Sequence, residues 1–178
     1  MKVHKFIRSL VNDDLALLDG TELRRVPVPT PLYTARDGRV FYLYRNRLCE
    51  RVVKTNRKNN YCKRCKTGNV QGQRYPYVIV QSKACYVHVL MALTWLGPRP
   101  IVVDPKGVAV RMEIDHLNGD ILDWRAENLE WVTPEENRKR ARLLRVLRSI
   151  GRDPKLIPYD ELRAIMNHYE FVNPSKIN

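Results

Sequence analysis

Four polar side chains between residues 115 and 137 have the types and spacing that hydrolysis of a phosphate ester needs. Hydrolysis requires a base that activates water, a cation that neutralises charge building on the phosphate, and a group that holds the base in its working tautomer. His116 suits the base, because an imidazole with an unperturbed pKa near ~6.5 accepts a proton at neutral pH. Asn128 can orient this imidazole by hydrogen bonding.

Asp115 and Asn137 provide oxygen donors for a hard cation. Mg²⁺ prefers oxygen ligands and keeps several waters, so one carboxylate and one amide, completed by substrate phosphate, make a sufficient site. We therefore expect Mg²⁺ at Asp115 and Asn137, with Mn²⁺ as the alternative ion. The pattern calls for no small-molecule cofactor.

Local signals predict the elements that must position these side chains. Residues 110–116 alternate apolar and polar side chains as a half-buried strand does, and residues 117–120 follow as a turn. Residues 128–132 are a second strand candidate. A helix then begins with Thr133 as N-cap, Pro134 at its first position and Glu136 closing a capping box. Asn137 falls in the first turn of that helix.

This combination carries a family resemblance. Val87-His88, the run from Asp115 to Asp120, the run from Glu127 to Thr133, and Glu136-Asn137 together resemble the HNH endonucleases of phages and group I introns. A lone Asp-His pair would carry no weight, but the whole set in this order is specific. The closest resemblance spans residues 88–140, and a looser one covers residues 33–87.

The resemblance implies a two-stranded hairpin and a helix around one divalent ion, the ββα-metal fold. By motif, His116 is the general base, Asn128 positions it, and Asp115 and Asn137 bind the metal. The third motif residue is Asn, as in the intron-encoded homing subset, which favours Mg²⁺ or Mn²⁺ over Zn²⁺. Trp124 departs from the family, where a small polar residue is frequent in this loop, and leaves the packing of the loop undecided.

The charge balance indicates a polyanionic partner. The 178 residues carry 32 Lys and Arg against 19 Asp and Glu, a formal net charge of +13. Such a field attracts nucleic acid, although a ribosomal, membrane-surface or simply basic protein has the same balance. No run of about 18 to 20 apolar residues is present and no signal-type run follows the first residues. We expect no membrane partner and a cytoplasmic location, in a bacterial or phage-infected cell.

The rest of the chain predicts an α+β protein of four parts. Residues 1–32 form an N-terminal helix, from a three- and four-residue apolar spacing over residues 5–18, and a Pro-rich linker at residues 26–31. Residues 33–87 form a strand-rich DNA-binding module, with strands at residues 39–44, 75–80 and 84–87. Residues 88–152 form the catalytic domain, beginning with a short apolar helix at residues 88–96. Residues 153–178 form a helical segment.

Basic residues mark two expected DNA-binding regions. Residues 54–74 are rich in Lys, Arg, Asn and Gln and suit strands laid on a DNA groove, although a solvated loop at the sheet edge explains them equally well. The helix after Asn137 is basic, with an apolar stripe of Leu143, Leu144, Leu147 and Ile150. The expected DNA-binding residues are Lys54, Arg57, Lys58, Lys63, Arg64, Arg74, Arg138, Arg140, Arg142 and Arg145. His88 is interpreted as structural or phosphate-contacting.

The four cysteines allow a structural zinc site, at Cys49, Cys62, Cys65 and Cys85. Only one Cys-x-x-Cys pair is present, and Cys85 lies in an apolar strand where a buried thiol is common, so reduced thiols are the favoured interpretation.

The function predicted from the sequence is a Mg²⁺-dependent HNH endonuclease of homing type that cleaves or nicks double-stranded DNA, leaving 5′-phosphate and 3′-hydroxyl ends. Two alternatives remain open. The first is a catalytically silent DNA-binding protein with the same fold, and the second is an RNA-binding or ribosome-associated basic protein.

Overall fold

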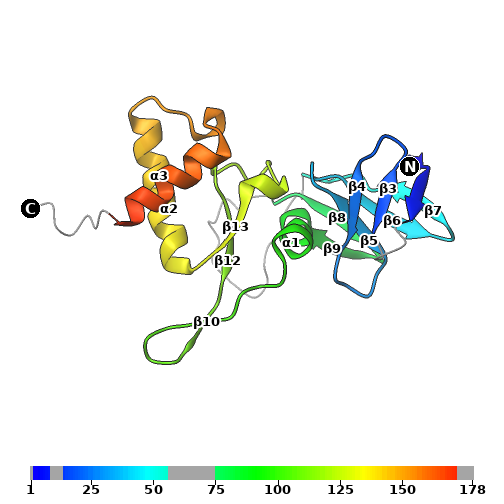
Figure 1. Cartoon of the computed structure of the whole chain (residues 1–178), viewed down its shortest axis with the longest axis horizontal. Helices are drawn as coiled ribbons and strands as arrows, with labels where there is room; N and C mark the ends of the chain where they lie inside the picture. Colours follow the sequence, from blue (N-terminus) through cyan, green and yellow to red (C-terminus); the bar gives the residue numbers. More distant parts are fainter. Residues whose placement is uncertain (1, 9–13, 56–74, 172–178) are drawn as a thin grey trace, which may run out of the picture.

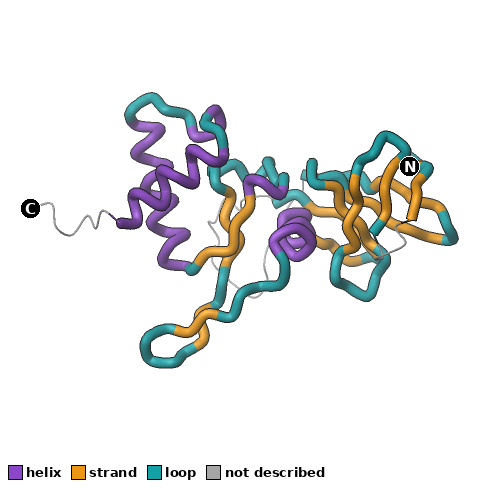
Figure 2. The backbone as a smooth tube through the Cα atoms, viewed as in Figure 1, coloured by secondary structure: helices purple, strands orange, loops and turns teal. Residues whose placement is uncertain are grey.

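The computed structural model describes residues 2–8, 14–55 and 75–171. These residues form a mixed, strand-rich structure with three α-helices, compatible with the α+β class expected from the sequence (Figures 1 and 2). The strands that precede the first helix gather at the N-terminal end, the later strands lie in the middle, and two of the helices lie at the C-terminal end. Among the described residues, no helix combines the length and the apolar character that crossing a bilayer requires.

Seven short strands form one antiparallel sheet in the order β1-β7-β6-β5-β4-β3-β2. Their bounds are β1 Val3–His4, β2 Phe6–Arg8, β3 Leu15–Leu17, β4 Glu22–Arg25, β5 Leu32–Ala35, β6 Val40–Tyr44 and β7 Arg47–Glu50. Only Lys5 separates β1 from β2, although these strands stand at opposite edges of the order. Since one residue spans only about 3.5 Å, the sheet must curl until its edges meet.

The helix predicted over residues 5–18 is wrong, because its described residues form strands. Phe6 pairs with Leu17 and Arg8 with Leu15 across an antiparallel ladder. Leu15 and Leu17 are buried inside the curled sheet, whereas Ile7 and Leu18, which a helix would place on its apolar face, are exposed. Every second side chain, Leu15 and Leu17 on either side of Ala16, points to the same face of β3. Pairing with β4 buries that face, so the strand pattern decides the structure in place of the three- and four-residue helical spacing.

The Pro-rich stretch at residues 26–31 is not a linker between modules. It connects β4 to β5, which pair with each other, and Val26 donates its backbone N–H to the Leu32 carbonyl at 2.9 Å. Val26 is fully buried in a core that also contains residues of the C-terminal half of the chain. The prolines rigidify a connection inside the sheet, because each fixes its own φ.

A hairpin and a helix follow residues 56–74, which lie outside the described residues. Strands β8 (Tyr77–Val80) and β9 (Lys83–Tyr86) pair antiparallel, and α1 (Val87–Met91) continues into a single π-helical turn, η1 (Ala92–Leu96). These elements confirm the strands and the short apolar helix expected here. Val78, Met91 and Leu129 belong to one core that joins the curled sheet to the strands further along the chain. The two halves of the molecule therefore share a hydrophobic interior.

Two further hairpins replace the single strand predicted at residues 110–116. Strands β10 (Val102–Val103) and β11 (Ala109–Val110) form one hairpin, while β12 (Glu113–His116) pairs with β13 (Leu129–Val132). The chain changes partner at residues 111–112, where Met112 is buried. A short 3₁₀ turn, η2 (Ala126–Asn128), leads into β13.

The C-terminal helices pack on each other and on the hairpin β12–β13. Helix α2 (Pro134–Ser149) begins with the predicted cap: Thr133 Oγ1 accepts from the Glu136 backbone at 3.2 Å, and Glu136 Oε2 accepts from the Thr133 backbone at 2.7 Å. A 3₁₀ turn, η3 (Pro154–Leu156), connects it to α3 (Tyr159–Phe171). Leu143, Leu144 and Leu147 form the predicted stripe, facing α3, but Ile150 is exposed.

Candidate active site

Strand β12 and helix α2 bring Asp115, His116 and Asn137 to the wall of one cavity. Asp115 and His116 end β12, where His116 pairs with Leu129 as the last pair of the hairpin. Asn137 lies in the first turn of α2, fixed by the Thr133 cap. The cavity has a volume of about 250 Å³, and Tyr75, Gly119 and Arg148 also line it. The sequence therefore predicted three residues that the fold does bring together.

The His116 imidazole is buried and uncharged at neutral pH. Only 5% of the residue is exposed, and burial lowers the pKa of its imidazole to about 4, against the opposing effect of Asp123 and Asp120. Its Nε2 atom is buried without a hydrogen-bond partner. A neutral imidazole with an unused ring nitrogen is the form that accepts a proton from water.

Asp115 has a buried carboxylate oxygen, Oδ2, with no hydrogen-bond partner. Burial raises the pKa of Asp115, and Arg140, whose Nη1 lies 3.7 Å from Oδ2, opposes that shift. Arg140 also donates to Glu130 Oε2 at 2.6 Å from a buried position. Arg140 was expected on an exposed DNA-binding face. That prediction is wrong, because the guanidinium is turned inward to compensate two carboxylates.

Asn137 is held by an acidic neighbour at the start of β12. Its Nδ2 donates to Glu113 Oε2 at 2.7 Å, which leaves the amide Oδ1 as an acceptor. A buried carboxylate oxygen without a hydrogen bond and an amide oxygen, both on one cavity, suit a hard divalent cation. Among the described residues, no group of three or more His, Cys, Asp or Glu is arranged to hold a metal, so water and substrate would complete such a site.

Asn128 holds the loop that follows His116, and its described hydrogen bonds do not reach the imidazole. Residues 117–128, named the site loop from here on, begin after the last pair of the hairpin. Asn128 Oδ1 accepts from the Asn118 backbone at 3.0 Å, while its Nδ2 donates to Asn118 Oδ1 at 3.0 Å and to the Asp123 carbonyl at 2.7 Å. These bonds direct the amide to the loop rather than to the imidazole that it was expected to orient, so Asn128 positions the backbone beside His116.

The tight turn predicted after His116 is confirmed. The Gly119 N–H donates to the His116 carbonyl at 2.7 Å, and the φ of Gly119 is +68°. A Cβ on Gly119 would lie 2.9 Å from Leu144 Cδ1 and from an Arg148 nitrogen. Glycine is therefore needed both for the backbone conformation and for the close approach of the site loop to α2.

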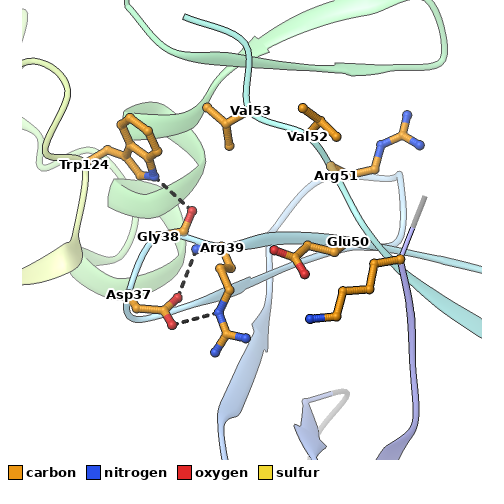
Figure 3. A pocket seen from close by; sticks show the side chains of 9 residues that line it. Asp37, Gly38, Arg39, Glu50, Arg51, Val52, Val53 and Trp124 are labelled. Carbon is orange, nitrogen blue, oxygen red and sulfur yellow. Dashed lines mark hydrogen bonds and ion pairs between the residues drawn. The ribbon is translucent and has the colours of Figure 1, made fainter.

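Trp124 fastens the site loop to the curled sheet. Its indole Nε1 donates to the Gly38 carbonyl at 2.9 Å, and Figure 3 shows the indole directed at the turn between β5 and β6. Gly38 has a φ of +93°, and a Cβ there would lie 2.5 Å from Trp124 Nε1. Arg36, in the same turn, forms an ion pair with Glu127 at 3.1 Å. Trp124, whose role the sequence left undecided, thus connects the two halves of the chain.

Helix α3 and the turn before it hold the other side of the site loop. Tyr159 donates its hydroxyl to Asp123 Oδ2 at 2.6 Å, Lys155 pairs with Asp120 at 2.8 Å, and Arg163 donates to the Glu127 carbonyl at 2.6 Å. Burial raises the pKa of Asp123, but hydrogen bonds from Arg125, Tyr159 and Asn118 outweigh it and hold the pKa at about 2. The site loop is therefore bonded both to the N-terminal curled sheet and to the C-terminal η3 and α3.

His88 and Tyr75 pack around the His116 ring. The ring centroids of His88 and His116 are 5.5 Å apart, those of Tyr75 and His88 4.6 Å, and those of Tyr75 and His116 6.1 Å. Burial lowers the pKa of His88 to about 4, with a further contribution from His116, and its Nδ1 is buried without a hydrogen-bond partner. His88 extends from α1 and forms part of the surroundings of the site.

Comparison with known proteins identifies the segment that contains this geometry. Residues 85–139 match the family model described as HNH endonuclease. Over these residues the chain is similar to the HNH endonucleases. A protein of Acanthamoeba polyphaga mimivirus described as an uncharacterised HNH endonuclease is 49% identical over 51 residues. That match covers 29% of this chain and only 11% of the viral protein. No solved structure matches the chain significantly.

The HNH segment contains Asp115, His116, Asn128 and Asn137, but several residues that hold it lie outside. Gly38 precedes the segment, and Lys155, Tyr159 and Arg163 follow it. Sequence reasoning missed these contacts, since nothing local links residue 38 to residue 124. Arg140 had a usable signal, because it stands three residues after Asn137 and so shares its face of α2.

The other predicted binding residues fall into two groups. Lys54 is exposed beside an isolated bridge to Tyr77, and Arg138, Arg142 and Arg145 are exposed on α2. Arg57, Lys58, Lys63, Arg64 and Arg74 lie outside the described residues.

Of the cysteines that could hold zinc, Cys62 and Cys65 also lie outside the described residues. Cys49 is buried in β7, and Cys85 packs against the core that includes residues of β8. Within the described part of the chain, no zinc site is found.

Proposed function

We propose that the protein is a Mg²⁺-dependent endonuclease that hydrolyses phosphodiester bonds of double-stranded DNA, leaving 5′-phosphate and 3′-hydroxyl ends. One observation carries the proposal: a neutral, buried His116 with an unused Nε2 shares a polar cavity with Asp115 and Asn137. The match of residues 85–139 to the HNH endonuclease family model supports it.

In this mechanism His116 Nε2 accepts a proton from water as the water oxygen forms its bond to phosphorus. The bond to the 3′ oxygen breaks, and that oxygen takes a proton from solvent water to become the 3′-hydroxyl. The site loop, held by Asn128, keeps the imidazole in place, so little reorganisation is needed. Asp115 Oδ2 and Asn137 Oδ1 would hold Mg²⁺. The ion would supply positive charge against the developing phosphorane and the leaving oxygen.

The exposed Arg138, Arg142 and Arg145 of α2 would grip phosphates beside the scissile bond, since they extend from the helix that carries Asn137. The net charge of +13 supports a nucleic acid substrate. One site in each chain cuts one strand, so a monomer acts as a nickase unless it pairs or acts twice. The homing role, and a cytoplasmic site of action in a bacterial or phage-infected cell, follow the family resemblance and belong to the same proposal.

A supercoiled-plasmid assay tests the proposal. We expect wild-type protein to nick the plasmid with Mg²⁺ and not with EDTA, and His116→Ala to lose about 10²-fold or more of the rate. His168→Ala, at an exposed histidine of α3, serves as the matched control and should keep full activity. Tight duplex binding without nicking would instead identify a silent DNA-binding protein. Preference for structured RNA over duplex DNA at matched salt would identify an RNA-binding protein.

A further inference from the structure

Hairpin β10–β11 is a ribbon that projects from the rest of the molecule. The ribbon is defined as residues 99–111; it pairs Val102 with Val110 and Val103 with Ala109. Its turn is well formed: the Gly107 N–H donates to the Asp104 carbonyl at 2.9 Å, and Asp104 Oδ1 accepts from the backbone of Lys106 and Val108. In Figure 1 the ribbon extends away from β12, β13 and the helices.

Apolar side chains are exposed on both faces of the ribbon. Val103 and Ala109 are cross-strand partners and share one face with Ile101, while Val108 lies on the opposite face with Val102 and Val110. Ile101 is 91% exposed, and Val103 and Val108 are each 60% exposed. Within the described residues, β10 and β11 pair only with each other. Such exposure of β-branched side chains on a two-stranded ribbon is costly unless a partner covers them.

The charges and the tip of the ribbon indicate what that partner is. Arg99, Lys106 and Arg111 are exposed along it, and the one acidic residue, Asp104, is engaged in the turn. Pro105 stands exposed at the tip. Proteins that enter a DNA groove with a two-stranded ribbon combine basic residues for the phosphates with an apolar residue, including proline, inserted between base steps. This basic border favours a polyanionic partner over an uncharged apolar surface.

The ribbon also starts beside the candidate active site. Met112 is buried between β11 and β12 and anchors the base of the ribbon, and the next residue, Glu113, accepts from Asn137 at 2.7 Å. Pro105 precedes Asp115 by ten residues, which span at most about 35 Å, or about one helical turn of duplex. The tip therefore lies no further than about one helical turn from Asp115.

We infer that the ribbon enters the minor groove of the duplex within about one helical turn of the scissile phosphate and inserts an apolar side chain between base pairs, bending the DNA. The inference rests on the proposed function for the identity of the ligand. It adds a contact outside the catalytic residues and a deformation of the substrate.

The test measures binding and bending in EDTA, so that neither depends on cleavage. The probe is a duplex of about 40 base pairs, or about four helical turns, taken from a region nicked by wild type or, without nicking, from the plasmid at large. Fluorescence anisotropy reports affinity, energy transfer between end labels reports bending, and 2-aminopurine reports unstacking. The variants are the double substitution Ile101→Ser with Val103→Ser, and the single substitutions Pro105→Ala and Lys106→Gln.

The double variant should bind about tenfold more weakly, since two apolar side chains lose their burial, and should lose the bend. Lys106→Gln should lower the slope of log affinity against log salt by about one and leave the bend in place. Leu156→Ser, at an 83% exposed residue of η3, is the matched control and should change neither measurement. Pro105→Ala, at a turn position outside both strands, should reduce the 2-aminopurine signal by itself.

Three results would overturn the inference: unchanged affinity and bending in the double variant and Pro105→Ala, reduced self-association with duplex binding intact, or a loss confined to structured RNA. A wild type that bends duplex through the ribbon but never nicks it would refute the proposed nuclease and leave the ribbon assignment standing. The two proposals therefore fail separately.

Discussion

The site loop and the ribbon adjoin opposite ends of the same strand, β12. Among the described residues, the rest of the molecule makes many hydrogen bonds to the site loop and few contacts with the ribbon. The site loop is bonded internally by Asn128, to the curled sheet through Trp124, and to α3 through Tyr159. The ribbon is held by its own ladder and turn, and by Arg99 lying over the Trp131 ring at 5.6 Å.

This difference matches two demands that the proposed endonuclease activity makes. A general base must be held within a fraction of an ångström of its working position, which calls for buried and satisfied hydrogen bonds around it. A groove-entering segment must instead keep its side chains uncovered until the substrate arrives. Substitutions in the site loop should therefore reduce both stability and cleavage, whereas substitutions in the ribbon should affect binding alone.

The largest effect is expected from Asn128→Ala. The substitution removes the partners of the Asn118 N–H and of the Asp123 carbonyl in a fully buried position. Unfolding free energy should fall by about 2 to 4 kcal/mol and the single-turnover cleavage rate by about 10 to 100-fold. Urea denaturation and single-turnover nicking measure these two quantities. Asn167→Ala, at an exposed position of α3, is the control, and equal behaviour of the two variants would contradict the role given to Asn128.

A pair of glycines tests the contact between Trp124 and the curled sheet. Gly38→Ala should cost about 1 to 3 kcal/mol, because the new Cβ meets the indole and the φ is positive. Gly20 has a similar φ of +85° with nothing within 4 Å, so Gly20→Ala isolates the cost of the backbone conformation. Thermal unfolding should separate the variants, and the cleavage rate should fall only for Gly38→Ala. Matching rates would mean that the sheet does not influence the site.

The carboxylate of Asp123 should make the site loop sensitive to acid. Its pKa is about 2 in the folded protein and 3.8 in its ordinary state, so its ionised form stabilises the fold above pH 3.8. This contribution is lost as the pH falls toward about 2. Wild type should therefore exceed Asp123→Asn in stability at neutral pH, and the gap should narrow over that window. Urea titrations at a series of pH values measure the gap, and a constant gap would contradict the assignment.

The smallest effect on stability is expected in the ribbon. Val103→Ser should change the unfolding free energy by no more than about 0.5 kcal/mol, because the side chain is largely exposed. Differential scanning calorimetry of the variant and wild type measures this. A loss of several kcal/mol would show that the ribbon is packed in solution, and the contrast with the site loop would disappear.

Local sequence signals were reliable where a segment satisfies its own polar groups. The cap formed by Thr133, Pro134 and Glu136 set the start of α2 and so the position of Asn137, because all of its hydrogen bonds lie within four residues. The turn at Gly119 is local in the same sense. The adjacency of Asp115 and His116 at the end of a strand needed only the alternation of residues that led up to them.

Local signals failed where burial depends on a distant partner. Residues 6–8 and 15–17 fit a helix by spacing, yet they became strands because a curled sheet was there to pair with them. The run of basic residues on α2 predicted an exposed Arg140, but ion pairs with Asp115 and Glu130 turn its side chain inward. Asn128 has the residue type to orient an imidazole, but the register of the hairpin directs it to the loop.

The sequence alone indicated the candidate residues for the proposed chemistry and the local elements that present them, because capping, turns and strand alternation act over a few residues. The tertiary structure decided how firmly they are held. Gly38 meets Trp124 across 86 positions and Tyr159 meets Asp123 across 36, and such contacts exist only once the chain has folded. Contacts between distant segments depend on the closure of the sheet and the packing of α3, which no short stretch of residues encodes.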